Sequence, residues 1–323
     1  MIYLDSAATT YLKPRSVINA MMDYMENFGG NPGRGGHILS MRAADKVYSC
    51  REAIASLLSC SPDEIILTPS ATFAINLAIK GTLSVTDHAI ISDNSHNSMI
   101  RPLNKTCAYS LCSSPEDAEK KIRYNTKMLL VNHASNVNGE VCDIDGYIRV
   151  AKENNLMLLV DAAQSLGHIK LEASGIDFIA SSGHKGLYGP QGTGFLYIRK
   201  GNAVNSIIEG GTGFHSESLE QPLIIPEGLE SGTINGVGFA GLTEGVKFAK
   251  KHMNEDMVLM KYLVEEIKKI PHIVVYLPEK GISVPVLSFN FKDADCVRVS
   301  EYLSEKYGIC TRAGLQGTIQ ELL

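Results

Sequence analysis

Short apolar runs alternate with longer amphipathic stretches between residues 64 and 200, and this alternation limits the architectures that the chain can adopt. Six runs predict strands, over residues 65–68, 89–92, 128–132, 157–160, 178–180 and 195–198. Helices are predicted over residues 42–58, 72–80, 115–123 and 146–154. Continuous Val, Ile and Leu runs separated by helices are typical of a mostly parallel sheet with helices on both faces. The short, glycine-rich spacing between residues 180 and 195 predicts a hairpin-like return, and with it one antiparallel strand.

We expect an α/β protein with two domains, because 323 residues exceed one typical hydrophobic core. A large domain is predicted over residues 14–225. A smaller C-terminal α/β domain is predicted over residues 226–323, with residues 1–13 packed against it. Residues 201–235 are rich in Gly, Ser and Pro and weakly periodic, which predicts a loop and crossover. A long helix over 236–270, a strand over 284–291 and a helix over 295–307 that ends at Gly308 are expected to follow.

Charge and cysteine content narrow the class of protein. The formal net charge of −5 disfavours a nucleic-acid or membrane partner, since either would require a basic face. Seven cysteines, without a CxxC pair, favour reduced thiols over a disulfide framework or a zinc site. The N-terminus lacks a signal pattern, and no apolar run approaches the roughly 20 residues that span a bilayer. We therefore expect a cytoplasmic protein.

Two motifs at the ends of neighbouring predicted strands carry the strongest chemical signal. Asp161 closes a buried run and is followed three residues later by Gln164, and Lys185 follows the next strand in a glycine-rich segment. A lysine amine can form a Schiff base with the aldehyde of pyridoxal 5'-phosphate (PLP), and a buried carboxylate can keep its pyridine nitrogen protonated. Ligands of open α/β sheets lie beyond the carboxyl ends of the strands, which is where these residues are expected. The sequence thus predicts a PLP site.

Other polar residues follow the remaining strands. Thr72 lies at a predicted helix start that could hold a phosphate, His96 could stack on a flat ring, and the Asn136 amide could reach a phenolic oxygen. Each also has an ordinary structural interpretation: an N-cap region, a solvated histidine and a turn asparagine. Asp161 could likewise cap the next turn, and Lys185 could be a surface lysine. All of these residues follow strands, in an order compatible with a single site, and this favours the PLP site over the structural interpretations.

In order along the chain, the motifs resemble the class V (fold type I) PLP-dependent aminotransferase family, and within it the cysteine desulfurase and selenocysteine lyase group. The motifs are residues 3–10 (YLDSAATT), 31–37 (NPGRGGH), 71–72, His96, Asn136, Asp161, Gln164, 182–185 (SGHK), 230–235 (ESGTIN) and 311–315 (TRAGL). The resemblance covers nearly the whole chain. It implies the fold type I architecture, a mostly parallel central sheet with a smaller C-terminal domain.

The resemblance also implies residue roles. Lys185 would bind PLP covalently and abstract the substrate Cα proton, Asp161 would pair with the pyridine nitrogen, and His96 would stack on the ring and assist proton transfer. The other cofactor-binding residues would be Ala71, Thr72, Asn136, Gln164, Ser182, His184 and, from a second subunit of a homodimer, Thr233. The substrate would be bound by Arg312, which would grip its carboxylate, with His37 and Asn136. The implied reaction takes L-cysteine or selenocysteine to alanine and passes the sulfur or selenium on, in some cases to an acceptor protein.

The sequence departs from this family where the sulfur-accepting cysteine is expected. In the family, the arginine element runs on to a cysteine, but here residues 316–323 contain none and the last cysteine is Cys310. We expect Cys310 to finish a strand and to be chemically inert. Two explanations stay open. Either an internal stretch between Leu315 and Gly317 is missing from this sequence, since residues 318–323 have the character of the family's last helix, or the chain is truly shortened.

Three functions therefore compete. The first is a PLP-dependent, cysteine desulfurase-like enzyme. The second is another reaction of the class V aminotransferase family, which the products would distinguish. The third is a PLP-binding paralogue without desulfurase activity, which would bind the cofactor without turnover. Neither a GxGxxG fingerprint after an early strand nor a P-loop occurs in the sequence, so nicotinamide and nucleoside triphosphate sites are disfavoured.

Overall fold

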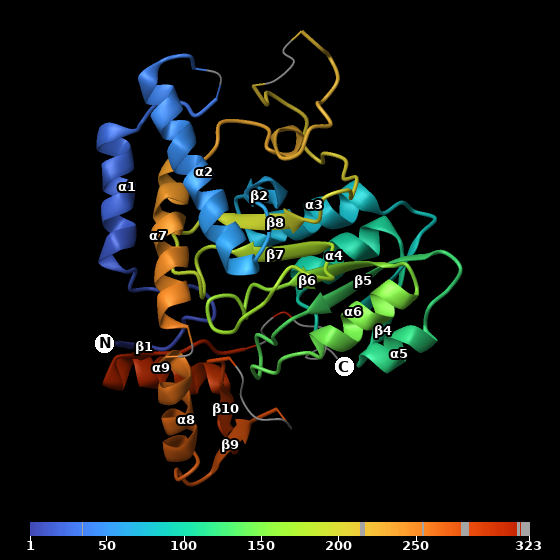
Figure 1. Cartoon of the computed structure of the whole chain (residues 1–323). Coiled ribbons are helices and arrows are strands. Elements are labelled where there is room, and N and C mark those ends of the chain that lie inside the picture. Colours follow the sequence, from blue (N-terminus) through green and yellow to red (C-terminus); the bar gives the residue numbers. More distant parts are fainter. Residues whose placement is uncertain (34, 214–216, 254, 279–283, 315–316, 318–323) are drawn as a thin grey trace.

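A seven-stranded sheet forms the centre of the computed structural model, which describes residues 1–323 except 34, 214–216, 254, 279–283, 315–316 and 318–323 (Figure 1). Its strand order is β2-β8-β7-β6-β5-β3-β4. The strands are β2 (Ile65–Thr68), β3 (His88–Ser92), β4 (Ala108–Cys112), β5 (Thr126–Asn132), β6 (Met157–Asp161), β7 (Phe178–Ser182) and β8 (Gly194–Ile198). All neighbours pair in parallel except β8, which is antiparallel to both β7 and β2. The predicted single antiparallel strand is confirmed.

Helices cover both faces of this sheet, because its strands are apolar on both sides. Successive residues of β5 belong to different cores: Leu129 and Val131 pack into one, and Met128 and Leu130 into the other. The first core receives side chains from α2 (Ile38–Leu58), α6 (Ile144–Glu153) and α7 (Gly236–His252). The second receives them from α3 (Ala71–Thr82) and α4 (Asn97–Thr106). The remaining helices of this part are α1 (Arg15–Asn27), which packs on α7, and α5 (Pro115–Lys120).

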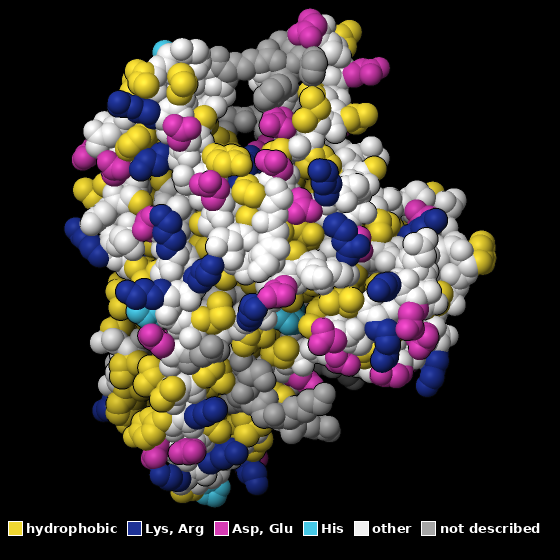
Figure 2. All heavy atoms as spheres, in the orientation of Figure 1, with side chains coloured by type: hydrophobic (Ala, Val, Ile, Leu, Met, Phe, Trp, Pro, Cys, Tyr) yellow, Lys and Arg dark blue, Asp and Glu magenta, His cyan; other side chains and the backbone are white. Residues whose placement is uncertain are grey.

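The C-terminal part of the chain is joined to the N-terminal residues by a two-stranded parallel sheet. Strand β1 (Ile2–Tyr3) pairs with β11 (Ile309–Cys310). Beside this pair lie α8 (Glu255–Ile267), α9 (Cys296–Tyr307) and the antiparallel pair of β9 (Ile273–Tyr276) and β10 (Ser288–Phe291). Apolar side chains gather over the lower part of the molecule, where α8 lies (Figure 2). The exposed ones on this helix are Val258, Leu259 and Tyr262.

The predicted fold class is confirmed by this sheet and its helices, but several predicted elements differ. The long helix over 236–270 is wrong: α7 ends at His252 and α8 begins at Glu255, with Met253 in an extended conformation between them. The strand predicted over 284–291 covers only β10. Helices α1 and α4 and strands β4 and β9 are additions. The division into two domains stays a prediction.

Candidate active site

The carboxyl ends of β5, β6 and β7 place the predicted residues along one edge of the sheet. In the register of these strands, Asn132 lies opposite Asp161, the last residue of β6. Ser182 is the last residue of β7, and Lys185 follows it in the loop to β8. Because parallel strands end at the same edge, the loops after β6 and β7 must run side by side.

These two loops approach each other so closely that glycine is required at the contact. Gly167 has a φ of +94°, and a Cβ at this position would overlap with the backbone oxygen of Gly186. A Cβ on Gly186 would in turn overlap with the backbone oxygen of Leu166. The residue beside Lys185 is thus pressed against the loop that carries Gln164.

Asp161 and Lys185 influence each other at this edge. Burial lowers the pKa of the Lys185 amine, the charge of Asp161 raises it, and the charge of Arg312 lowers it further. Asp161 is 4% exposed, and its Oδ1 accepts a hydrogen bond from the Ala163 N–H at 3.0 Å. Asp161 therefore makes the turn-capping contact that the sequence left open, and its charge also reaches the lysine.

Polar groups that suit a phosphate lie at the start of α3. The Ser182 hydroxyl accepts a long hydrogen bond, 3.4 Å, from the Ala71 N–H, which belongs to the first turn of this helix. His184 carries a buried Nδ1 atom that has no hydrogen-bond partner in the described part of the chain. Burial, with the charges of Lys185 and Lys13, lowers the pKa of His184 to about 4, so its ring is neutral at pH 7. A neutral ring can donate one hydrogen bond to an anion.

Thr72 and His96 face a common hollow of about 330 Å³ between α3 and α4. His96 is the N-cap of α4, and its Nδ1 accepts a hydrogen bond from the Ser98 N–H at 3.1 Å. Gly317 also lies at this hollow, because its oxygen accepts a hydrogen bond from the Asn97 N–H at 2.9 Å. Gly317 therefore lies beside the predicted ring-stacking histidine, His96.

The two predicted amides follow the carboxyl ends of β5 and β6. The Gln164 Nε2 group donates to the Ala7 oxygen at 3.0 Å, and its side chain is buried. Asn136 follows β5 and is partly buried. Both amides thus lie after strand ends at this sheet edge, and the N-terminal segment fixes Gln164; their roles stay predictions.

The N-terminal segment also binds the Lys185 loop, which the sequence did not indicate. Thr10 Oγ1 donates to the Lys185 oxygen at 2.7 Å, and Lys13 Nζ donates to the His184 oxygen at 3.2 Å. Burial lowers the pKa of Lys13 to about 8. A second unpredicted contact lies beneath the site, where the buried His133 Nδ1 and Ser165 Oγ are 2.8 Å apart. No sequence pattern marked these residues, because their contacts depend on pairing between distant segments.

Arg312 lies beside the N-terminus of the chain. Its Nε and Nη2 groups donate to the two carboxylate oxygens of Asp5, each at 3.0 Å. Cys310 finishes β11, as expected, and is only partly exposed. Residues 315–316 and 318–323, in which the missing cysteine loop and the last helix were sought, lie outside the described residues.

Two predicted residues are not brought to this edge within one chain. His37 is the exposed N-cap of α2 and accepts a hydrogen bond from the Ser40 N–H at 3.3 Å. Thr233 is exposed in the loop before α7. The roles of both residues stay predictions.

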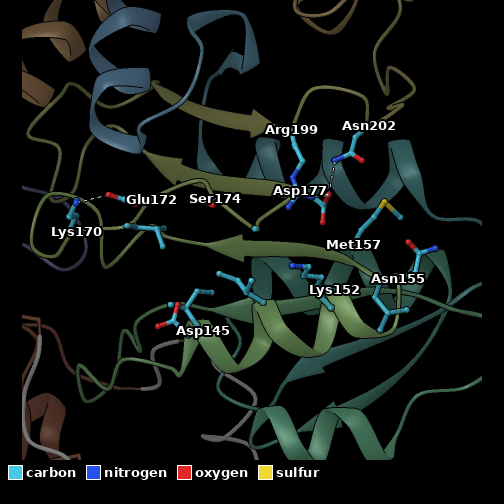
Figure 3. A pocket seen from close by; sticks show the side chains of 16 residues that line it. Asp145, Lys152, Asn155, Met157, Lys170, Glu172, Ser174, Asp177, Arg199 and Asn202 are labelled. Atoms are coloured by element: carbon cyan, nitrogen blue, oxygen red, sulfur yellow. Dashed lines mark hydrogen bonds and ion pairs between the residues drawn. The ribbon is translucent and has the colours of Figure 1, made fainter.

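A groove at the opposite end of the strands contains none of the predicted residues (Figure 3). Its walls include Met157, where β6 begins, and Asp177, which precedes β7. Four of its charged side chains form two pairs, Asp177 with Arg199 at 3.4 Å and Lys170 with Glu172 at 2.5 Å. The predicted site residues therefore lie away from this groove.

Comparison with known proteins defines the class of this chain. It belongs to the aminotransferase class V family, whose sequence profile matches residues 2–321. It is 32% identical to a probable cysteine desulfurase of Methanothermobacter thermautotrophicus, over 97% of this chain and 84% of that protein. A probable cysteine desulfurase of Halalkalibacterium halodurans is also 32% identical, over 97% of this chain and 83% of the relative. The predicted family is confirmed.

A solved structure gives the same result for the three-dimensional fold. The apo structure of a cysteine desulfurase from Thermococcus onnurineus superposes with a TM-score of 0.91 at 28% identity, and the match covers 99% of this chain and 86% of that one. The fold type I prediction is therefore confirmed.

Proposed function

We propose that this protein is a PLP-dependent enzyme of the cysteine desulfurase type, which takes L-cysteine or selenocysteine to alanine and transfers the sulfur or selenium. One observation carries the proposal: the Lys185 amine lies in a buried setting under the charge of Asp161, at the carboxyl edge of the sheet. The relatives named as cysteine desulfurases disfavour a different reaction of the family.

The residues present fit the cofactor. His184 offers a buried Nδ1 without a described partner, and Ser182 with the first turn of α3 offers donors for a phosphate. Asp161 is buried and able to hold a cationic nitrogen. Bound PLP would supply an electron-accepting ring that stabilises negative charge at the substrate Cα.

The chain's own residues would then perform the proton transfers and the binding. Burial keeps a larger share of the Lys185 amine neutral than in a solvated lysine, so its Nζ can accept the Cα proton. Arg312 would hold the substrate carboxylate through two parallel hydrogen bonds. Gln164, fixed to Ala7, and Asn136 would orient the ring.

The sulfur acceptor separates this proposal from a second candidate. The second candidate is a PLP-binding paralogue without turnover, which the relatives named as cysteine desulfurases do not favour. Incubation with L-cysteine and an added thiol, such as dithiothreitol, distinguishes the two functions. A desulfurase would release alanine and sulfide in equal amounts, whereas the paralogue would bind PLP and release neither.

We further propose a homodimer with shared active sites. Thr233 and His37 are exposed in the single chain and would complete the site of a second subunit. Helices α1 and α2 also expose apolar side chains, among them Met22, Met25 and Met41, that such an interface would cover. Light scattering should give about twice the 35.1 kDa of one chain.

Location is the remaining part of the proposal. Within the described residues, no helix has the length and apolar character needed to cross a bilayer. We propose a cytoplasmic location on the basis of the unpaired cysteines.

The substitution Lys185→Ala tests the site assignment. The variant should lose the visible absorption band of bound PLP, and borohydride should no longer fix the cofactor to the protein. Lys170→Ala is a matched control, because Lys170 is exposed and pairs with Glu172 away from the site. Retention of both signals in Lys185→Ala would refute the assignment.

A further inference from the structure

The register of the β1–β11 pair sets Asp5 beside Arg312. Tyr3 lies opposite Cys310 in this parallel pair, and the Leu4 N–H donates to the Cys310 oxygen at 2.9 Å. Asp5 and Arg312 each lie two residues further along. Because side chains alternate between the faces of a strand, residues two apart point to the same side. The pairing therefore brings the two charged side chains together.

Asp5 is fixed by more than its side chain. Its backbone oxygen accepts hydrogen bonds from the Ala8 N–H at 3.0 Å and the Thr9 N–H at 3.3 Å, which close a turn. The segment that follows binds Gln164 through Ala7 and the Lys185 loop through Thr10. The position of the Asp5 carboxylate is thus tied to that of the predicted cofactor residues.

The contact between the two side chains uses only one edge of the guanidinium. Arg312 donates from Nε and Nη2, which form its lateral edge. A guanidinium has a second two-donor edge, formed by Nη1 and Nη2. Within the described residues, Nη1 makes no hydrogen bond, and the Arg312 side chain remains 52% exposed. One edge is thus held by Asp5 while the other stays available.

We propose that Asp5 is a positioning residue that presents the Nη1–Nη2 edge of Arg312 to the α-carboxylate of the substrate. The inference rests on the proposed function. Asp5 joins this guanidinium to the N-terminal segment that binds the Lys185 loop, and the charge of Arg312 lowers the pKa of the Lys185 amine. Asp5 fixes its direction, because a bidentate contact restricts rotation of a planar group.

Asp5→Asn tests this role. Asparagine has nearly the same shape but loses the charge and one acceptor, so the guanidinium should become poorly oriented. The KM for L-cysteine should rise about tenfold, while kcat changes less than about twofold. The absorption change of the PLP-bound protein on titration with L-alanine should likewise require about tenfold more ligand. Titration with ethylamine, which lacks only the carboxylate of alanine, should be unchanged.

Asp117→Asn is the control for the chemical change itself. Asp117 forms an ion pair with Lys121 at 2.7 Å on α5, outside the site. This variant should titrate with both amines as the wild-type protein does. The melting temperatures of both variants should be compared with that of the wild type, so that a loss of folding is recognised.

Three results would overturn the inference. A lower KM in Asp5→Asn would mean that Asp5 competes with the substrate for Arg312. An unchanged KM would mean that the contact has no role in binding. An equal loss for L-alanine and ethylamine would show general damage. If the wild-type protein responds to neither amine nor cysteine, the proposed function fails, and the inference with it.

Discussion

Arg51 and Glu230 form a nearly buried ion pair that joins α2 to the loop before α7. Arg51 Nη2 lies 2.6 Å from Glu230 Oε2, and Nη1 lies 2.9 Å from Oε1. Glu230 also accepts a hydrogen bond from the Leu67 N–H at 2.6 Å, and Arg51 donates to the Ile65 oxygen. The pair therefore attaches the segment that leads to Thr233 to the edge strand β2.

Removal of one partner of this pair should be strongly destabilising. Arg51→Met would leave the Glu230 carboxylate buried without its counter-charge, and the free energy of unfolding should fall by about 3–5 kcal/mol. Urea denaturation measures this loss. The exposed pair of Lys247 and Glu244 is the control, and Lys247→Met should cost less than about 1 kcal/mol. Equal losses in the two variants would contradict the prediction.

The contact of the two loops predicts a large effect of Gly167→Ala. The new Cβ would require a φ of +94° and would collide with the Gly186 backbone, so the Lys185 loop must shift. We expect a loss of about 2–4 kcal/mol in stability and of most PLP binding. Gly201 has a similar φ of +101°, but a Cβ at this position would meet no atom within 4 Å. Gly201→Ala therefore measures the backbone strain alone, and its free energy of unfolding should fall by about 1 kcal/mol. Urea denaturation and cofactor absorbance provide the two readouts.

Asp161→Asn separates the two interpretations of that residue. Asparagine can still accept the hydrogen bond from the Ala163 N–H, so a residue that only caps the turn would tolerate the change. A residue that holds a protonated ring nitrogen would not. We expect a normal melting temperature with a loss of about 100-fold or more in turnover. Turnover close to that of the wild type would identify Asp161 as a turn cap.

The buried His133 should make stability depend on pH. Burial lowers its pKa to about 4, whereas an unfolded histidine titrates at about 6.5. Below about pH 6.5 the unfolded chain therefore binds a proton that the folded chain does not, and stability falls as the pH decreases toward 4. Between pH 7.5 and pH 5 we expect His133 to contribute a loss of about 2 kcal/mol.

Comparison with His133→Gln isolates this contribution. The variant lacks the titrating group and can still bind the Ser165 hydroxyl, so its stability should fall less over the same pH range. Urea denaturation of both proteins at the two pH values gives the difference. Identical pH dependence would contradict the assignment of the effect to His133.

The elements that were predictable from sequence are those in which local pattern and tertiary environment agree. Strand β6 and its end at Asp161 followed from a continuous apolar run that is buried on both faces. The break between α7 and α8 was missed although basic residues end α7 and the acidic Glu255 and Asp256 begin α8, because the apolar residues on both sides fit one helical pattern. Helix α1 was missed although it is amphipathic, since it lies outside the alternating region.

The residues of the candidate site were predictable in type but not in their partners. Asp161, Gln164 and Lys185 were identified by their positions after strands and by family resemblance. The contact of Thr10 with the Lys185 loop and that of Asp5 with Arg312 join segments 175 and 307 residues apart. No local pattern encodes such pairs, because their members lie far apart in the sequence, and only the pairing of β1 with β11 places Asp5 beside Arg312.

The pairing of β1 with β11 also affects when the Asp5–Arg312 contact can form during synthesis. Asp5 leaves the ribosome 307 residues ahead of Arg312. At about 5–20 residues per second, roughly 15–60 seconds of synthesis separate the two partners. During this interval the central sheet can already form, whereas β1 stays unpaired until β11 has been made. The ion pair that we propose to position the substrate therefore cannot form until Arg312 has been made.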